Sequence, residues 1–491
     1  MTSGERSVIM EDHGDAYPAW RGGNVAGITC VHLDAHLDLS DEGLTPAHIE
    51  AMRQARTPES LRGLRADPHL PWGGYHGGNY LYPALLDGTV SSLVWVIPPW
   101  LPGQADLLTF TRVELQKWYQ VTLADHASFH LIDGTVRGTV LGRPFTLCTI
   151  ENLPRIEEPM LLDIDADYFL DHDDGLFTDV EVITETLSGL LDRAAMITVA
   201  YSVEGGYMPL EHRYVGDLVL RLLSGHDPSS ALAARHLRRG DTARAERRFS
   251  DALAAYEAAA REPWLAAAAR LKQSLVSSDL GRSDDARRLA AEAAAIDGRY
   301  APRALDVAFL FLRRGDPARA VSHLSRAREE NPLDASLTLY MEGVAHLLAQ
   351  HFDDAALAFQ RLLLSDALPP AECAQMSMML SRALLRAGQA VEAVSAARRA
   401  VDTGPGIGAH HLQLAHALRA TNRSEEAARH YRKAISLTDH AIASIEAHRA
   451  LIALYQASGQ TLLAQGEMRR LARKAGDADV ERRARGEGSE T

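Results

Sequence analysis

VHLDAHLDL, residues 31–39, places polar side chains directly after an apolar run, and LLDIDADYF, residues 161–169, repeats this arrangement later in the chain. Both stretches carry imidazole or carboxylate side chains at every second position: His32, Asp34, His36 and Asp38 in the first, and Asp163, Asp165 and Asp167 in the second. The apolar runs at 28–31 and 160–162 predict buried strands. Strands of an α/β sheet present such residues at the carboxyl edge, where ligands of these folds bind.

Carboxylates gathered at one sheet edge repel one another unless cations lie between them. Oxygen ligands mixed with imidazole suit divalent ions such as Mn(II). A single motif of this kind is often only a solvated acidic loop. Two such motifs, each behind an apolar run in one domain, favour a site for two divalent metal ions.

The motifs resemble those of a known superfamily. DAHLD at 34–38 resembles the DAHxD motif of arginases and other ureohydrolases, and DIDAD at 163–167 resembles their DxDxxD. EDH at 11–13 stands where ureohydrolases carry Gly-Gly-Asp-His. The segments EDHGDAYPAW, GGNYLYPAL and WVIPPW are similar to a divergent arginase-like family that includes peptide arginases, which convert arginine side chains of ribosomal peptides into ornithine. The resemblance covers about the first 220 residues and implies a three-layer α/β domain with a parallel sheet.

The resemblance also implies a role for each motif residue. One Mn(II) ion would be held by His13, Asp34, Asp38 and Asp163, and a second by Asp34, His36, Asp163 and Asp165, so that Asp34 and Asp163 are shared. His32 lies on the same side of its strand and is expected beneath the two ions rather than on them. Asp167, the third acid of the second motif, comes one residue earlier than in the family.

Three further residues are candidates for catalysis and substrate binding. His76, in WGGYHGGNY, corresponds to the proton-shuttle histidine of ureohydrolases, and Asn79 of the same segment is a candidate substrate ligand. Glu204, in VEGGYMP, corresponds to the glutamate that binds the guanidinium. The chemistry fits these residue types. A histidine with a pKa of about 6.5 can protonate a departing amine, and a carboxylate can accept hydrogen bonds from two guanidinium N–H groups.

Charge is divided unevenly along the 491 residues. Residues 1–225 carry 32 acidic and 14 basic side chains, whereas residues 226–491 carry 33 and 37. An acidic first half favours cations and argues against a nucleic-acid partner. Because we find no apolar run long enough to span a membrane, a polar amino terminus and only three scattered cysteines, we expect a cytoplasmic protein without a membrane partner.

The second half contains a repeat. A small residue is followed four positions later by an aromatic or aliphatic one and three positions after that by a small one, and the first three examples start 34 residues apart. The pattern recurs at Ala252-Tyr256-Ala259, Ala286-Ala290-Ala293, Ala320-Leu324-Ala327, Ala355-Phe359-Leu362, Ala393-Ala397-Ala400 and Ala427-Tyr431-Ala434, with a weaker example at Ala464-Met468. This period and spacing predict about seven tetratricopeptide repeats, which stack into an all-α solenoid with a concave groove.

We therefore expect an arginase-like hydrolase domain at 1–225, a repeat domain at 231–476 and a polar tail at 477–491. The expected reaction is hydrolysis of arginine side chains in a peptide or protein to ornithine and urea, with the repeats recruiting that substrate. Hydrolysis of free arginine or agmatine is an alternative, as is a metal-dependent deacetylase. A further alternative is a repeat scaffold whose first domain has no activity.

Overall fold

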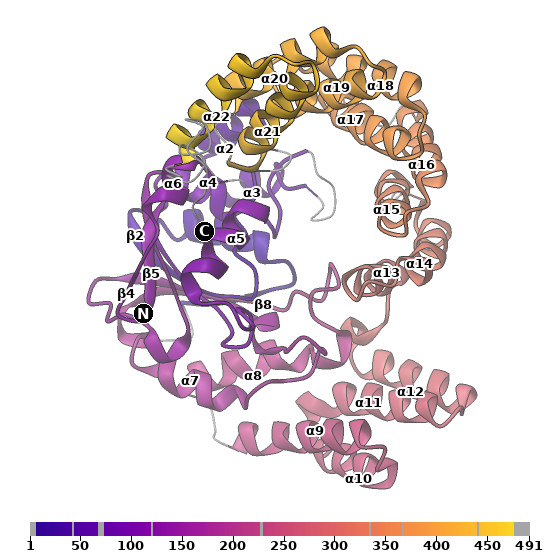
Figure 1. Ribbon diagram of the computed structural model, residues 1–491. Coiled ribbons are helices and arrows are strands. Elements are labelled where there is room, and N and C mark those ends of the chain that lie inside the picture. Colours follow the sequence, from indigo (N-terminus) through magenta and orange to yellow (C-terminus); the bar gives the residue numbers. More distant parts are fainter. Residues whose placement is uncertain are drawn as a thin grey trace.

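The computed structural model describes residues 6–41, 44–66, 73–118, 121–225, 229–332, 335–365, 368, 370–438 and 441–475. An α/β domain occupies the first half of the chain, and an arc of helices occupies the second half (Figure 1). The boundary between the two expected domains, residues 226–230, lies partly outside the described residues, and the predicted polar tail at 477–491 lies wholly outside them. No helix within the described ranges has both the length and the apolarity that a membrane span requires.

The α/β domain is built on one eight-stranded sheet in the order β1-β8-β7-β2-β3-β6-β5-β4. The strands are β1 (Ser7–Met10), β2 (Ile28–Leu33), β3 (Val90–Val96), β4 (His130–Ile132), β5 (Thr135–Val140), β6 (Arg143–Cys148), β7 (Met160–Asp165) and β8 (Ala194–Ala200). All neighbouring pairs from β1 to β6 in this order are parallel. Both apolar runs singled out in the sequence are therefore strands, β2 and β7, and they are adjacent.

The expectation of a wholly parallel sheet is wrong at one edge, where β4, β5 and β6 pair antiparallel to one another. Two-residue turns cause the reversal. Asp133-Gly134 joins β4 to β5, and Leu141-Gly142 joins β5 to β6, with positive φ at all four residues. Such turns match the twist of a hairpin and cannot form the long crossover that parallel strands need. The sheet is therefore mixed.

Helices cover both faces of the sheet. One face carries α1 (Ala16–Gly22), α2 (Pro46–Gln54), α3 (Pro58–Arg62), α4 (Leu81–Leu86) and α5 (Leu107–Trp118), with α6 (Leu123–Ser128) beside β5; the other carries α7 (Val180–Ser188) and α8 (Tyr214–Leu223). Alternate residues of β7 point into the two cores, since Leu161 packs with Trp20 whereas Leu162 packs with Leu218. This alternation explains why β7 is apolar throughout until its carboxylates.

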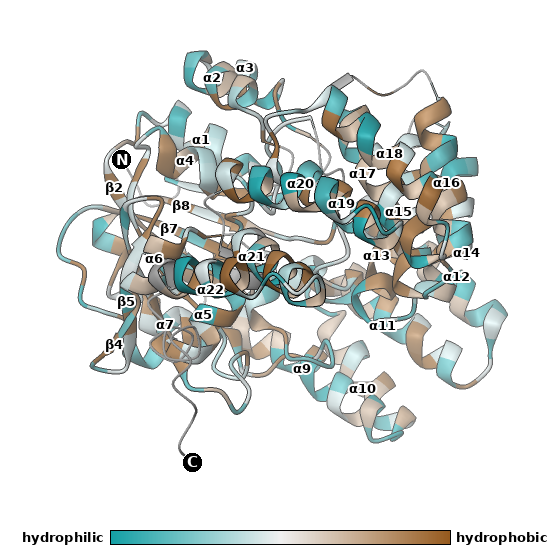
Figure 2. Ribbon diagram, turned by 45° about the horizontal axis from the view of Figure 1, so that its top comes forward, coloured by the Kyte–Doolittle hydropathy of each residue, from teal (hydrophilic) through white to brown (hydrophobic). Residues whose placement is uncertain are grey.

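The second half forms seven antiparallel helix pairs within the described residues. They are α9 (Ser229–Ala245) with α10 (Phe249–Ala259), α11 (Ala266–Asp279) with α12 (Ser283–Ile296), α13 (Ala304–Arg313) with α14 (Pro317–Glu330), α15 (Ala335–Leu348) with α16 (Phe352–Leu364), α17 (Pro370–Arg386) with α18 (Ala390–Thr403), α19 (Gly408–Ala420) with α20 (Ser424–Leu437), and α21 (Ala441–Ala457) with α22 (Thr461–Ala475). Hydrophobic and hydrophilic segments alternate along these helices (Figure 2), as expected when one face of each is buried.

The repeat pattern of the sequence describes how each pair packs. Ala252, Tyr256 and Ala259 are completely buried on the second helix of the first pair. The Tyr256 ring fits against Gly240 of the first helix, where an added Cβ would lie 2.2 Å from a ring carbon. Gly343 faces Phe359 in the same way, at 2.5 Å. Small residues in one helix thus make room for a large residue in its partner.

The arc contacts the α/β domain at both of its ends (Figure 1). At the first end, one continuous hydrophobic core joins β7, β8, α7 and α8 to the repeat residues Leu237, Tyr256 and Tyr300. At the far end, α21 contacts α5 and α22 contacts α6. The sheet and the first repeats therefore form a single packed body rather than two units on a flexible linker.

This shared core predicts that damage to the first repeat is felt in the sheet. Tyr256→Ala removes a fully buried aromatic ring and should lower the free energy of unfolding by about 3–5 kcal/mol, because a cavity remains. Urea unfolding would measure the loss, and hydrogen exchange should become faster in β7 and β8 as well as in α10. Leu462→Ala, at an 83% exposed position, serves as the control. Faster exchange confined to the repeats would contradict a common core.

Candidate metal centre

The carboxyl ends of β2 and β7 bring the two sequence motifs together. The strands pair in register with His32 opposite Asp163, so the residues that follow them emerge side by side. Asp34 comes directly after β2, and Asp165 is the last residue of β7. Asp38 adopts a left-handed backbone conformation with φ of 51°, a strained arrangement of the kind concentrated at functional sites.

A third segment of the chain, the short turn that follows β1, adds His13 to these residues. Asp12 accepts a hydrogen bond from the Gly14 N–H at 2.7 Å and starts the short 3-10 turn His13–Asp15. An added Cβ on Gly14 would lie 2.9 Å from the backbone carbon of His76, so the turn packs tightly against that loop. The EDH segment is therefore a fixed turn, and His13 is only 3% exposed.

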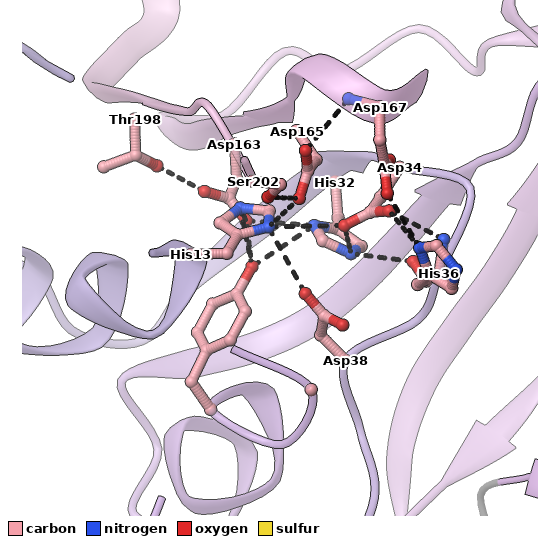
Figure 3. A network of polar contacts seen from close by, with 12 residues as sticks. His13, His32, Asp34, His36, Asp38, Asp163, Asp165, Asp167, Thr198 and Ser202 are labelled. Atoms are coloured by element: carbon pink, nitrogen blue, oxygen red, sulfur yellow. Dashed lines mark hydrogen bonds and ion pairs between the residues drawn. The ribbon is translucent and has the colours of Figure 1, made fainter. Parts of the chain in front are cut away.

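The His13 ring lies where four carboxylates converge (Figure 3). Its Nδ1 is 3.3 Å from Asp34 Oδ2, 3.3 Å from Asp38 Oδ2 and 3.1 Å from Asp165 Oδ2. Its Nε2 is 3.1 Å from Asp163 Oδ2. One nitrogen cannot donate a proton to three carboxylates at once. His13, Asp34, Asp38 and Asp165 offer ligand atoms close enough together to hold one metal ion.

A second group of ligand atoms lies beside the first and shares Asp34. His36 Nδ1 is 2.9 Å from Asp167 Oδ2 and 3.5 Å from Asp34 Oδ1. These three residues form another set that could hold a metal ion. The His36 side chain is 41% exposed, so this second position opens toward solvent. Two adjacent positions joined by one carboxylate are the arrangement expected of a dinuclear site.

The electrostatics of the cluster favour cations. Burial, together with the charges of Asp167, Asp38 and Asp165, raises the pKa of Asp34 to about 8. Burial opposes protonation of His13, yet Asp163 and the other carboxylates raise its pKa well above the usual value. Among the described residues, buried Asp34 Oδ2 and Asp167 Oδ1 have no hydrogen-bond partner. Unsatisfied carboxylate oxygens are costly, and the donor set fits divalent metal ions.

Asp163 belongs to neither of these two groups. With His13 and His32 it forms a third group whose ligand atoms lie close enough together to hold a metal ion, so its expected role as a ligand stays a prediction. Its Oδ1 accepts a hydrogen bond from Thr198, and its Oδ2 accepts one from Tyr80 at 2.5 Å and lies 2.9 Å from His32 Nδ1. These contacts follow from its depth: Asp163 lies inside the sheet between His32 of β2 and Thr198 of β8, whereas Asp165 and Asp167 lie at the edge. Within the two groups that share Asp34, Asp165 and Asp167 stand where the resemblance implied Asp163 and Asp165.

The glycine-rich segment does not present its polar residues to the pocket as expected. Asn79 is completely buried, and its side chain accepts the His76 N–H at 2.7 Å, so it shapes the loop and is not placed to bind substrate. His76 is 9% exposed, and its Nδ1 accepts the Gly78 N–H at 3.1 Å. Burial lowers its pKa to about 4, against the opposing charge of Asp38. Gly77 and Gly78, rather than His76, line the pocket.

Glu204 lines the same pocket as His13, His36, Asp38, Asp165 and Asp167, which belong to the groups that could hold metal ions. Partial burial raises the pKa of Glu204, an effect that the nearby Arg303 opposes. Three other lining residues, Asp12, Ser202 and Tyr207, were not predicted from the sequence. Ser202 donates a hydrogen bond to Asp165 at 2.5 Å, and the Tyr207 ring meets the His36 ring edge-on at 5.0 Å. Ser202 and Tyr207 follow β8, which ends at the same edge of the sheet as β2 and β7. That position in the sequence could have identified both residues.

Comparisons with known proteins concern the repeats. A family model for the tetratricopeptide repeat matches residues 340–406, from α15 to α18. The chain is similar to the solved structure of MamA from Desulfovibrio magneticus RS-1 at 18% identity and a TM-score of 0.32, over 36% of this chain and 95% of that one. TTC0263, a TPR protein of Thermus thermophilus, matches at 20% identity and a TM-score of 0.29, over 38% and 96%. YrrB, described as a TPR protein with an unusual peptide-binding site, matches at 16% and 0.31, over 40% and 97%. No curated protein matches the chain.

The split of ligands between the two positions can be tested by substitution. Asp34→Asn should abolish binding of about two Mn(II) ions, because both positions use this carboxylate. Asp167→Asn should remove mainly the ion beside His36. Elemental analysis after Mn(II) loading would measure both effects, with exposed Asp173→Asn as the control. Full occupancy in Asp167→Asn would show that Asp167 is not a ligand.

Metal binding should also depend on pH in a defined direction. Asp34, with its pKa raised to about 8 before an ion binds, is mostly protonated at pH 7. A metal ion must displace that proton, so the affinity for Mn(II) should rise with pH between about pH 7 and pH 8. Calorimetric titrations in two buffers of different ionisation enthalpy would report proton release at pH 7. Binding without proton release would contradict the raised pKa of the cluster.

Proposed function

We propose that this protein is a dinuclear metal hydrolase that converts arginine residues of a peptide or protein into ornithine, with release of urea. The proposal rests on one observation: members of two groups that could each hold a metal ion, and that share Asp34, line one pocket together with a partly exposed carboxylate, Glu204. The resemblance of the DAHLD and DIDAD segments to ureohydrolase motifs supports the same reaction.

The reaction adds water to the guanidinium carbon and breaks its bond to the side-chain nitrogen. The oxygen of water becomes the urea oxygen, and the departing nitrogen gains a proton to become the ornithine amine. The guanidinium carbon resists attack because three nitrogens share its positive charge. Two divalent ions, Mn(II) by preference, would supply a strong nucleophile near neutral pH, because metal coordination lowers the pKa of water toward roughly 7.

The residues of the chain hold the metal ions and position the substrate. His13, Asp34, Asp38 and Asp165 would hold one ion, and Asp34, His36 and Asp167 the other. Ser202 orients Asp165 through its hydrogen bond, and Thr198 orients Asp163 beneath the site. Glu204 would accept N–H groups of the guanidinium and fix its carbon over the ions.

Proton delivery by His76 stays a prediction and requires movement of the loop. The buried ring lies below Gly78, and its lowered pKa leaves it neutral at pH 7. A neutral imidazole can accept the proton that water loses and pass it to the departing amine. For that step, Gly77 and Gly78 would have to open so that the ring reaches the pocket.

Charge favours a cationic substrate over the alternatives. Carboxylates dominate the lining of the pocket: Asp12, Asp38, Asp165, Asp167 and Glu204. A deacetylase would bind a neutral amide and has no use for Glu204. In an inactive scaffold, the buried cluster of acids would destabilise the fold and would serve no catalytic purpose. Free arginine or agmatine remains the second candidate, because either carries the same guanidinium.

The repeats supply a reason to prefer a peptide or protein. Tetratricopeptide repeats stack into a curved surface that extended partners can occupy. A substrate chain held there would raise the local concentration of its arginine at the pocket without new contacts to the guanidinium. The arc begins beside α8 and ends at α5 and α6 (Figure 1), and between these ends Arg303 contacts Glu204 of the pocket.

Replacement of the proposed clamp tests the function. Glu204→Gln should keep the bound Mn(II) and lose roughly 10–100-fold in kcat/KM for an arginine-bearing peptide, because a neutral amide forfeits a charge-assisted hydrogen bond of about 1.5–3 kcal/mol. Urea release by the metal-loaded full chain would measure the loss, with exposed Glu157→Gln as the control. Absence of urea release from the unsubstituted protein would rule out the reaction; loss of Mn(II) in Glu204→Gln would instead reassign the residue.

A further inference from the structure

Arg303, a residue of the repeat domain, lies on the proposed substrate clamp. It stands immediately before α13, and its Nη1 is 3.1 Å from Glu204 Oε1. The protein thus already places a guanidinium group against the carboxylate that is proposed to bind one.

Asp306 holds this guanidinium in a defined orientation. Arg303 donates from Nε to Asp306 Oδ2 and from Nη2 to Asp306 Oδ1, both at 2.7 Å. The bidentate pair occupies one edge of the planar group and leaves Nη1 directed at Glu204. Arg303 can therefore leave Glu204 and still keep a charge partner.

The backbones on both sides of the contact are fixed to each other. Arg313 of α13 donates to the carbonyl of Gly206 at 3.0 Å, and Arg314 donates to Asp174 at 2.6 Å. Gly206 has a φ of 73°, and an added Cβ there would lie 2.6 Å from the Leu310 nitrogen. The segment that carries Glu204 and the start of α13 are thus packed together, so the pairing of Arg303 with Glu204 follows from the docking of the repeats.

We infer that Arg303 is a specificity-determining residue, which occupies the guanidinium position at Glu204 until a substrate arginine displaces it. This inference rests on the proposed function of Glu204. The consequence is that the pocket discriminates between a free guanidinium compound and an arginine of a tethered chain. A small guanidine in solution competes with an intramolecular group, whereas an arginine in a chain held by the repeats also has a high local concentration. Both side chains are about half exposed, so the contact is weak enough to exchange.

Binding of agmatine, a small guanidinium compound, tests the inference without reference to turnover. Calorimetry on the Mn(II)-loaded full chain should show agmatine binding roughly twofold to fivefold tighter in Arg303→Gln than in the unsubstituted protein. Arg303→Lys keeps the charge near Glu204 and should bind agmatine about as weakly as the unsubstituted protein. The matched control is Arg326→Gln, which removes an exposed ion pair to Glu330 within α14, contacts neither Glu204 nor the segment around it, and should leave agmatine affinity unchanged.

A double substitution shows whether the effect passes through Glu204. Arg303→Gln should give no gain in affinity when Glu204→Gln is also present, since the two residues compete for one interaction. Unchanged or weaker agmatine binding in Arg303→Gln would overturn the inference, as would an equal gain in the Glu204→Gln background. Urea release measured on the same samples reports separately on the proposed reaction. Failure of the reaction and failure of the inference about Arg303 are therefore distinguishable.

Discussion

Electrostatic repulsion among buried carboxylates is the constraint on which the rest of this molecule depends. Asp34, Asp38, Asp163, Asp165 and Asp167 are all at most 8% exposed; Asp163 lies just inside the carboxyl edge of the sheet, and the others lie at it. The other side chains labelled around these acids in Figure 3 carry imidazoles or hydroxyls, and imidazoles can share the carboxylates with metal ions. The pKa of Asp34 is raised because burial and its neighbours disfavour its charge, and a divalent ion would reverse that preference.

The sheet domain and the repeats act on this site together. The hydrophobic core that runs from β8 through α8 into the first repeats fixes where the arc begins. That placement packs α13 against the segment that follows β8. Arg303, which immediately precedes α13, therefore lies beside Glu204. The repeats are therefore placed to influence the pocket as well as to hold a partner. Deletion of the repeats would remove part of the core of the α/β domain, so the two functions cannot be separated by simple truncation.

The parts of the fold that could be read from the sequence are those set by local patterns. The runs before Asp34 and Asp163 predicted two strands, and their adjacency follows from the need to bring both motifs to one edge. The Ala252-Tyr256-Ala259 spacing predicted the repeats, because small and large residues must alternate where paired helices pack. The antiparallel edge of the sheet was missed, although Asp133-Gly134 is a hairpin signal.

The predicted and observed sites differ because side-chain depth and tertiary contacts, which a local sequence pattern does not record, decide which groups reach the pocket. Asp163, Asp165 and Asp167 are equivalent in spacing, and only their depth relative to the end of β7 decides which of them reach the edge. Asn79 was expected to face a substrate from a glycine-rich segment, yet its amide is used inside the loop. The contact between Arg303 and Glu204 depends on how the repeats dock on the sheet domain, which no local pattern records.

The central claim is that this cluster holds two divalent ions joined by Asp34. Anomalous diffraction at the manganese edge, from crystals of the Mn(II)-loaded full chain, tests it most directly. We expect two peaks, one bounded by His13, Asp34, Asp38 and Asp165 and the other by Asp34, His36 and Asp167. A single peak, or peaks ligated by Asp163 with Asp167 turned away, would contradict it.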